Sequence, residues 1–189
     1  MSETAFILSN LGTPSDSSDR AVGDFLREFL YDPAVIPLPS LVRYPLVHWL
    51  IVPRRAGKSA EKYRAIWTAE GSPLMVWSRA FQNEVKKHLK NPVLLGMRYG
   101  NPSLQDALSA VKNFERVVLV PLYPQFADAT SGSTASYFHE LARKADYRGK
   151  IGIFPAFPKA SFFTKPLADS IRPSLRARSE EHTSELQSH

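Results

Sequence analysis

Arginine, tyrosine, threonine and amide side chains follow three apolar runs of the sequence, each at the point where a run ends. The runs occupy residues 5–8, 93–95 and 117–120, and the polar clusters occupy residues 10–14, 97–100 and 121–125. These clusters contain no histidine, cysteine or paired carboxylate, the groups that most often perform acid–base or nucleophilic catalysis. Because guanidinium can grip a carboxylate through two parallel hydrogen bonds, the set favours holding a flat anionic ligand over catalysing a reaction.

The three apolar runs are typical of buried parallel strands, which read as short uninterrupted hydrophobic stretches. Residues 150–154 form a fourth run of this kind. The carboxyl ends of parallel strands meet at one edge of an open sheet, and ligands of such folds bind at that edge. We therefore expect the polar clusters to share one cleft.

Segments with apolar residues at helical spacing separate the expected strands. We expect Asp19 to cap the first helix, Asp32 and Pro33 to stop it, and Asn101 to cap the helix that follows the second strand. The other expected helices cover residues 55–67, 74–88 and 160–175, together with one that opens at residues 130–134. Strands that alternate with helices predict an α/β fold, in which a parallel sheet flanked by helices forms one Rossmann-like lobe.

Length and composition allow one well-buried domain, because the chain has 189 residues of which 43% are hydrophobic. The sequence has no cysteine, no clustered histidines, no glycine-rich nucleotide loop and no serine-hydrolase elbow. No stretch approaches the roughly 20 apolar residues of a membrane span, and no signal-type segment opens the chain. We therefore expect a cytoplasmic protein.

The net charge of +6 and the pI near 9.6 favour an acidic partner, which could be a nucleic acid, an anionic membrane surface or a small polycarboxylate. The tightest basic group lies beside a helix start and could equally be a solvated helix face; it comprises Arg54, Arg55, Lys58, Lys62 and Arg64. No compact basic stripe interleaved with aromatic residues is present, so we expect no nucleic-acid partner.

Two segments allow more than one interpretation. Residues 38–52 are the most apolar part of the chain, and they form either a core helix or an apolar lip over a hydrophobic ligand. The turn at residues 130–134 precedes a helix, and its free backbone N–H groups could bind an anion. The second feature supports an alternative function, a flavodoxin-like module that holds a phosphorylated cofactor.

Four motifs, taken in order, closely resemble the amino-terminal half of the ferrochelatase family, enzymes that insert ferrous iron into a porphyrin. The motifs are NLGTP at residues 10–14, GSPL at residues 71–74 preceded by Tyr63, MRYGNP at residues 97–102, and PLYPQF at residues 121–126. The resemblance covers residues 5–177 and implies one chelatase-type lobe of a normally two-lobed protein. Residues 66–74 are more similar to the protoporphyrin-using bacterial enzymes than to the coproporphyrin-using ones.

The resemblance also implies which residues contact the porphyrin. Leu11 matches a position that faces the macrocycle near the metal, and Arg98, Tyr99 and Tyr123 match motif positions at the strand ends. The positions that the resemblance associates with porphyrin binding are Arg54, Arg55, Tyr63 and Ser72. A porphyrin is a flat apolar disc edged with propionates, so it suits an apolar lip with arginines at its rim. The lip over residues 41–52 also makes peripheral membrane contact conceivable.

The family's catalytic histidine and glutamate motifs belong to the carboxyl-terminal half and do not occur in this sequence. We therefore expect no catalytic residue, no resident metal and no cofactor in this chain, which on its own should be inactive; ferrous iron is a substrate of the parent enzyme. Residues 178–189 resemble a translated sequencing adapter, so we assign residues 1–177 to the lobe and the rest to a non-native tail. A chelatase for another tetrapyrrole and metal stays an alternative.

Overall fold

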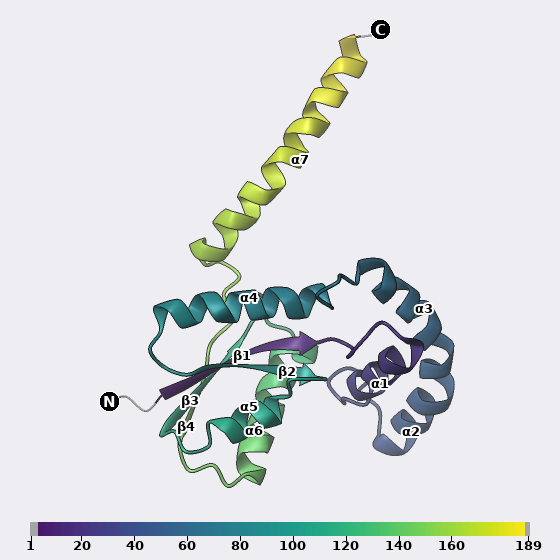
Figure 1. The fold of residues 1–189 in the computed structure, drawn as a ribbon. Helices are drawn as coiled ribbons and strands as arrows, with labels where there is room; N and C mark the ends of the chain where they lie inside the picture. Colours follow the sequence, from purple (N-terminus) through teal and green to yellow (C-terminus); the bar gives the residue numbers. More distant parts are fainter. Residues whose placement is uncertain (1–3, 188–189) are drawn as a thin grey trace.

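The computed structural model describes residues 4–187, and its centre is a four-stranded sheet in which every strand pair is parallel (Figure 1). The strands are β1 (Thr4–Gly12), β2 (Val93–Tyr99), β3 (Arg116–Pro121) and β4 (Lys150–Ile153), in the spatial order β2-β1-β3-β4. The predicted α/β fold with a parallel sheet flanked by helices is confirmed.

The strand register brings the predicted polar clusters to one edge of the sheet. Gly12 at the end of β1 lies opposite Tyr99 at the end of β2, and Ser9 lies opposite Pro121 at the end of β3. Gly12 has a φ of +105°, and a Cβ there would lie 1.8 Å from the Tyr99 carbonyl oxygen, so only glycine permits this close approach. The first two clusters therefore meet directly at this edge.

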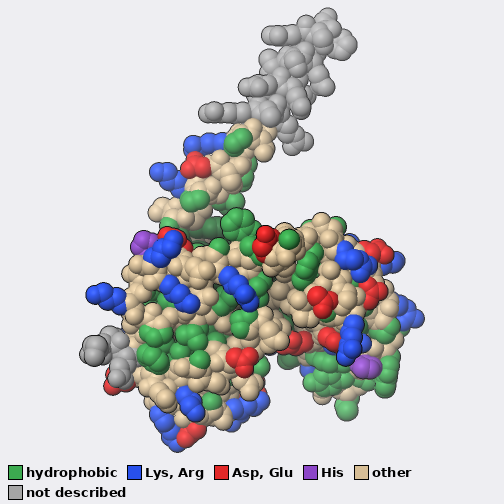
Figure 2. Space-filling view, viewed as in Figure 1, with side chains coloured by type: hydrophobic (Ala, Val, Ile, Leu, Met, Phe, Trp, Pro, Cys, Tyr) green, Lys and Arg blue, Asp and Glu red, His purple; other side chains and the backbone are tan. Residues whose placement is uncertain are grey.

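A group of helices extends from one end of the sheet (Figure 1). It consists of α1 (Asp19–Leu30), α2 (Ser40–Pro45), the π-helical turn η1 (Leu46–Ile51) and α3 (Val52–Ile66). Helical structure runs without a break from Ser40 to Ile66. Val47 and Val52 of this segment pack against Leu30 of α1 in a small buried cluster. Figure 2 shows hydrophobic side chains gathered at the lower right of the molecule, over α2.

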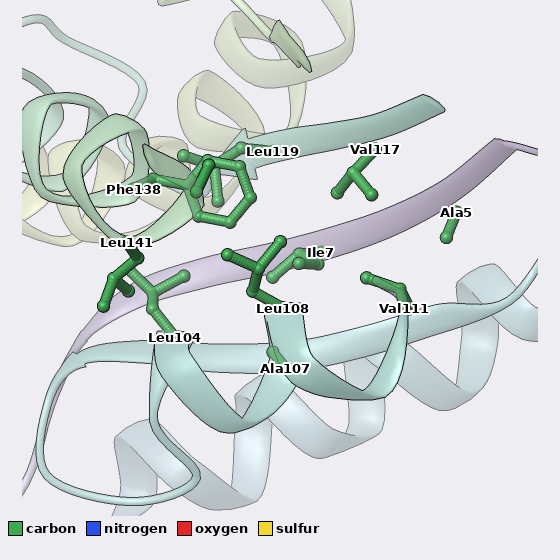
Figure 3. Packing of buried hydrophobic residues seen from close by; sticks show 11 residues of the cluster. Ala5, Ile7, Leu104, Ala107, Leu108, Val111, Val117, Leu119, Phe138 and Leu141 are labelled. Atoms are coloured by element: carbon green, nitrogen blue, oxygen red, sulfur yellow. The ribbon is translucent and has the colours of Figure 1, made fainter. Parts of the chain in front are cut away.

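Helices cover both faces of the sheet. Helix α4 (Pro73–His88) lies on one face, and α5 (Leu104–Ala110) and α6 (Ser133–Lys144) lie on the other (Figure 1). In the larger core, Leu108 and Phe138 point toward the strand residues Ile7 and Leu119 (Figure 3). Burial of a side chain of this size contributes about 1.5–3 kcal/mol, so this layer holds α5 and α6 against the sheet.

Two predicted helix caps were wrong by one and two residues. Ser18 rather than Asp19 caps α1, because its hydroxyl accepts a hydrogen bond from the Ala21 amide. Ser103 rather than Asn101 caps α5, where it forms a reciprocal capping box with Asp106. Asn101 and Pro102 lie before the helix, joined by a cis peptide bond.

The last helix, α7 (Ser161–Gln187), extends away from the rest of the molecule and is longer than the predicted helix over residues 160–175 (Figure 1). It continues across residue 177, the predicted boundary of the lobe. Residues 188–189 of the predicted tail lie outside the described part, as do the side chains of residues 176–187. The assignment of residues 178–189 to a non-native tail stays a prediction.

Candidate functional site

A buried polar network occupies the edge of the sheet where β2 ends. The side chains of Arg98, Tyr99 and Ser133 all donate to the same oxygen of the Asp32 carboxylate, Oδ2. The donor–acceptor distance is 2.8 Å for the Tyr99 hydroxyl and 2.5 Å for the Ser133 hydroxyl. Asp32 is only 7% exposed, so the network joins the end of α1, the end of β2 and the start of α6 inside the protein.

The guanidinium group of Arg98 is enclosed on several sides. Its carbon lies 4.4 Å from the centre of the Tyr99 ring and 4.1 Å from the centre of the Tyr137 ring, within the range of cation–π attraction. Its Nε atom donates to the Ser133 hydroxyl at 2.8 Å, and the side chain is only 12% exposed. Arg98 therefore has fixed partners in the protein itself.

The electrostatics of the network keep Asp32 ionised. Burial alone would raise the pKa of Asp32, but hydrogen bonds from Ser133, Ala34 and Tyr99 and the positive charge of Arg98 outweigh burial and lower the pKa below its usual value. Burial raises the pKa of the Tyr99 hydroxyl, which therefore stays protonated and donates. The geometry and the protonation states support each other.

Tyr123 lies after β3 with its hydroxyl enclosed. Burial raises the pKa of Tyr123 to about 12, while the nearby hydroxyl of Thr134 and the charge of Arg98 act in the opposite direction. Both the Tyr123 and the Thr134 hydroxyl oxygens are buried without a hydrogen bond of normal geometry to the described residues. Tyr123 therefore lies next to the Arg98 network, and its hydroxyl points into the protein.

Ser72 lies at the amino terminus of α4 but does not cap it through its side chain. Its hydroxyl instead accepts a hydrogen bond of 2.8 Å from Thr13, which follows β1. The tight turn between Thr68 and Gly71, closed by reciprocal backbone hydrogen bonds of 3.0 and 3.1 Å, places Ser72 at this position. Ser72 and Thr13 line an open depression of about 660 Å³, together with Trp67.

Helix α3 carries three of the predicted residues along its length. Tyr63 is half-buried, and its ring meets Phe25 and Trp67 edge-on at centroid distances of 6.5 and 6.3 Å. Arg54 and Arg55 are exposed near the start of the helix, and Arg54 donates to the Leu50 carbonyl at 3.1 Å. Both side chains are thus exposed beside η1, where they could meet a ligand.

The segment over residues 38–52 is largely an exposed surface rather than a core helix. Leu41 is 88% and Trp49 is 72% exposed, while Val47 between them is fully buried and anchors the segment. Arg43 is buried and donates to the carbonyl of Leu38 at 2.6 Å. We name the exposed large hydrophobic residues between residues 41 and 50 the apolar lip: Leu41, Val42, Tyr44, Trp49 and Leu50.

The structure also places the turn that the flavodoxin-like alternative requires. Residues Asp128–Gly132 form a π-helical turn, η2, that continues directly into α6. The amides of Thr130 and Gly132 both donate to the Ala127 carbonyl, and the Ser133 amide donates to the carbonyls of Asp128 and Thr130. The amides of Thr130, Gly132 and Ser133 are therefore occupied within the turn, and the flavodoxin-like alternative stays a prediction.

The predicted residues fall into two groups. Arg98, Tyr99 and Tyr123 gather at the carboxyl edge of the sheet, and Arg54 and Arg55 lie beside the apolar lip. Outside these two groups, Leu11 is half-buried at the end of β1, Tyr63 packs against Phe25 of α1, and Ser72 pairs with Thr13.

Sequence reasoning missed Asp32 and Ser133, which hold the strand-end network together. In the sequence Asp32 indicates only a helix stop, and its partners are 66, 67 and 101 residues away. Within residues 4–187, of which the side chains are described as far as residue 175, no group of three or more histidine, cysteine, aspartate or glutamate side chains is placed to hold a metal ion. No helix in the same range is long and apolar enough to cross a membrane.

The parallel sheet, its flanking helices and the polar cluster at its carboxyl edge define the class of the protein, a Rossmann-like α/β lobe, and in folds of this class that edge is where ligands bind. The chain belongs to the ferrochelatase family, whose model, described as Ferrochelatase, matches residues 3–188.

Curated relatives carry the same description. The ferrochelatase of Bdellovibrio bacteriovorus is 34% identical over 186 residues, which cover 96% of this chain and 56% of the relative. The ferrochelatase of Pseudomonas syringae pv. syringae is 39% identical over 178 residues, covering 93% and 52%. The Legionella pneumophila (strain Paris) protein is 46% identical over 129 residues, covering 67% and 39%. The chain thus spans about half the length of the curated relatives that it matches.

Proposed function

We propose that this chain is the porphyrin-binding half of an enzyme that inserts ferrous iron into protoporphyrin IX in haem biosynthesis. The observation that carries the proposal is the juxtaposition of the apolar lip with the exposed guanidinium groups of Arg54 and Arg55 on the same continuous helical segment. Membership of the ferrochelatase family supports the same substrate.

The lip and the arginines match the two chemical parts of a porphyrin. The macrocycle is flat and apolar, so it favours side chains such as Trp49 and Leu50, which otherwise face water. Its propionates favour guanidinium groups, which bind carboxylates through two parallel hydrogen bonds. The spacing of these groups along one helical segment therefore supports a binding mode in which the porphyrin lies against the lip with its propionates toward Arg54 and Arg55.

The other predicted residues receive less direct roles. Leu11 is half-buried at the carboxyl end of β1, and the Asn10 side chain accepts a hydrogen bond of 2.8 Å from its amide, which fixes the backbone there. We propose that Leu11 forms part of the apolar wall that faces the macrocycle. Tyr63 and Ser72 complete the floor on the side of α3 and α4.

Metallation requires removal of two pyrrole protons, so it needs acid–base groups as well as a porphyrin site. We propose that these groups belong to the other half of the parent enzyme and that this chain alone does not insert iron, which is a substrate rather than a resident cofactor. Robust zinc or iron insertion by the purified 189-residue chain would contradict this part of the proposal.

The test is a titration of the chain with protoporphyrin IX, followed by absorbance and fluorescence, beside an identical titration with FMN. Arg54→Gln combined with Arg55→Gln should raise the dissociation constant for the porphyrin about tenfold. The matched control is Lys112→Gln with Lys150→Gln, which removes the same charge from exposed positions near the amino-terminal edge of the sheet. Saturable binding of FMN but not of porphyrin would favour the alternative module and reject the proposal.

The apolar lip and the neighbouring basic residues of α3 also support peripheral contact with an anionic membrane, at which the chain would act from the cytoplasm. Vesicles of phosphatidylglycerol and phosphatidylcholine should co-sediment with the chain, and Trp49→Ser should reduce that binding. Equal sedimentation of the parent chain and of Trp49→Ser with the vesicles would exclude the lip as the membrane contact.

A further inference from the structure

The Asp32 carboxylate is the shared acceptor of groups that come from three parts of the fold. Besides the Arg98, Tyr99 and Ser133 side chains, the backbone amide of Ala34 donates to its second oxygen, Oδ1, at 2.7 Å. Burial of a carboxylate is costly unless hydrogen-bond donors replace the lost water. Movement of any of these donors away from Asp32 would therefore cost free energy. Asp32 thereby fixes the loop after α1 relative to the ends of β2 and α6.

Arg98 is already bound within the protein and is less accessible to a propionate than the exposed Arg54 and Arg55. Two of its nitrogens are committed, one to Asp32 and one to Ser133, and the rings of Tyr99 and Tyr137 cover its plane. These two bonds use two of the five N–H groups of the guanidinium, and the flanking rings together with the 12% exposure of the side chain limit how an outside carboxylate could approach the others. Its role at the strand end therefore differs from that of the exposed Arg54 and Arg55.

A continuous set of contacts leads from Asp32 to the apolar lip. The Asp32 carbonyl accepts hydrogen bonds of 3.0 Å from the amides of Val35 and Ile36. The Ile36 and Leu38 carbonyls in turn accept from the buried guanidinium of Arg43, which belongs to α2. The position of Asp32 therefore determines where the helical segment that bears the lip begins.

We propose that Asp32 is a positioning residue for porphyrin binding, which aligns the lip with the strand-end wall through Arg98, Ser133 and the loop after α1. The inference rests on the proposed function. Asp32 and Ser133 act through their neighbours and do not contact the substrate directly. Porphyrin affinity thus depends on a carboxylate buried behind the site.

The test compares Asp32→Asn and Ser133→Ala with the parent chain in titrations with protoporphyrin IX and with its dimethyl ester, at a temperature where circular dichroism shows each protein folded. Loss of alignment should raise the dissociation constant about tenfold for Asp32→Asn and about threefold for Ser133→Ala. The rise should be equal for the acid and the ester, because positioning affects the disc and not the propionates. Substitution of Arg54 and Arg55 should weaken binding of the acid alone.

The matched control is Asp106→Asn, which breaks a carboxylate network of the α5 capping box and should leave both dissociation constants unchanged. If Asp32→Asn does not fold, Ser133→Ala and Tyr99→Phe carry the same comparison. Unchanged affinity in the folded variants overturns the inference, and so does an effect that disappears with the ester, since this would make Arg98 a direct ligand of the propionate. Failure of the parent chain to bind either porphyrin rejects the proposed function instead.

Discussion

Asp32 is a buried carboxylate whose partners come from residues far away in the sequence. The positive charge of Arg98 balances the charge of Asp32. Two further acidic residues, Asp128 and Glu140, line the adjoining depression of about 410 Å³. Removing one partner of a buried ion pair leaves an uncompensated charge, which is costly even where the intact pair contributes little. The protonation of this one group therefore affects the stability of the whole strand edge.

The lowered pKa of Asp32 predicts a specific loss of stability in acid. In the unfolded chain its pKa is near 3.8, and in the folded protein it is lower, so ionised Asp32 stabilises the fold above pH 3.8. This contribution disappears as the pH falls through the folded pKa. Urea unfolding between pH 6 and pH 3 should show a smaller decline in unfolding free energy for Asp32→Asn than for the parent chain. Parallel declines would show that Asp32 does not carry this charge.

The Thr13–Ser72 hydrogen bond predicts a non-additive effect on stability. Both residues are buried, and Ser72→Ala would leave the Thr13 hydroxyl without its partner, at a cost of about 1–3 kcal/mol. Adding Thr13→Val removes that unsatisfied group, so the double variant should be more stable than the sum of the single changes predicts. Urea unfolding of the four proteins measures this coupling, and strictly additive changes would contradict it.

The sequence predicted that Arg98 and Tyr99 lie at the end of a strand, but not what holds their side chains there. Arg98 and Tyr99 stood out because polar residues follow an apolar run, which is a local signal. Their acceptor, Asp32, gave only a local helix-stop signal, because its contact with Ser133 spans 101 residues and depends on the packing of α1 and α6. Long-range polar pairs of this kind leave no periodic pattern in a single sequence.

At the scale of elements, apolar spacing predicted where strands and helices lie better than where they begin. All four predicted strands are present, and the helix predicted over residues 74–88 is α4 with one additional residue at its start. The cap errors arose because several polar residues in a row can all accept from an amide. The spacing of Ser103 and Asp106 matches a capping box and would have identified the true cap.

The capping box of α5 predicts a modest, local loss of stability. Ser103 accepts from the Asp106 amide at 3.0 Å and donates to its carboxylate at 2.7 Å. Ser103→Ala should lower the unfolding free energy by about 1 kcal/mol, because the first turn of the helix loses both bonds. Thermal unfolding should show the loss for Ser103→Ala and none for Ser109→Ala, a control on the same helix. Equal effects would mean that the box contributes nothing specific.

At the scale of the whole molecule, hydrophobic side chains lie exposed in places other than the apolar lip. Trp77 and Phe81 are 73% and 48% exposed on α4, and Phe162 and Leu175 are 65% and 61% exposed on α7, which extends away from the body (Figure 1). Exposed apolar surfaces of this kind favour association. The net charge of +6 opposes it, and salt screens that repulsion.

We therefore expect the 189-residue chain to self-associate, and to do so more strongly at high salt. Sedimentation velocity over a range of concentrations measures this directly. Trp77→Gln with Phe81→Gln should reduce the associated fraction, whereas Asn83→Gln, an exposed polar change on the same helix, should not. A monomer at every concentration and salt level would show that these side chains are tolerated in water.

We propose that the apolar lip and the two arginines beside it form half of a porphyrin site. The most direct measurement is the absorbance titration of the folded chain with protoporphyrin IX, repeated with Trp49→Ser and with Arg54→Gln and Arg55→Gln combined. We expect saturable binding by the parent chain, which both changes weaken about tenfold without altering the fold. Binding of equal strength in all three proteins, or no saturable binding by the parent chain, would contradict it.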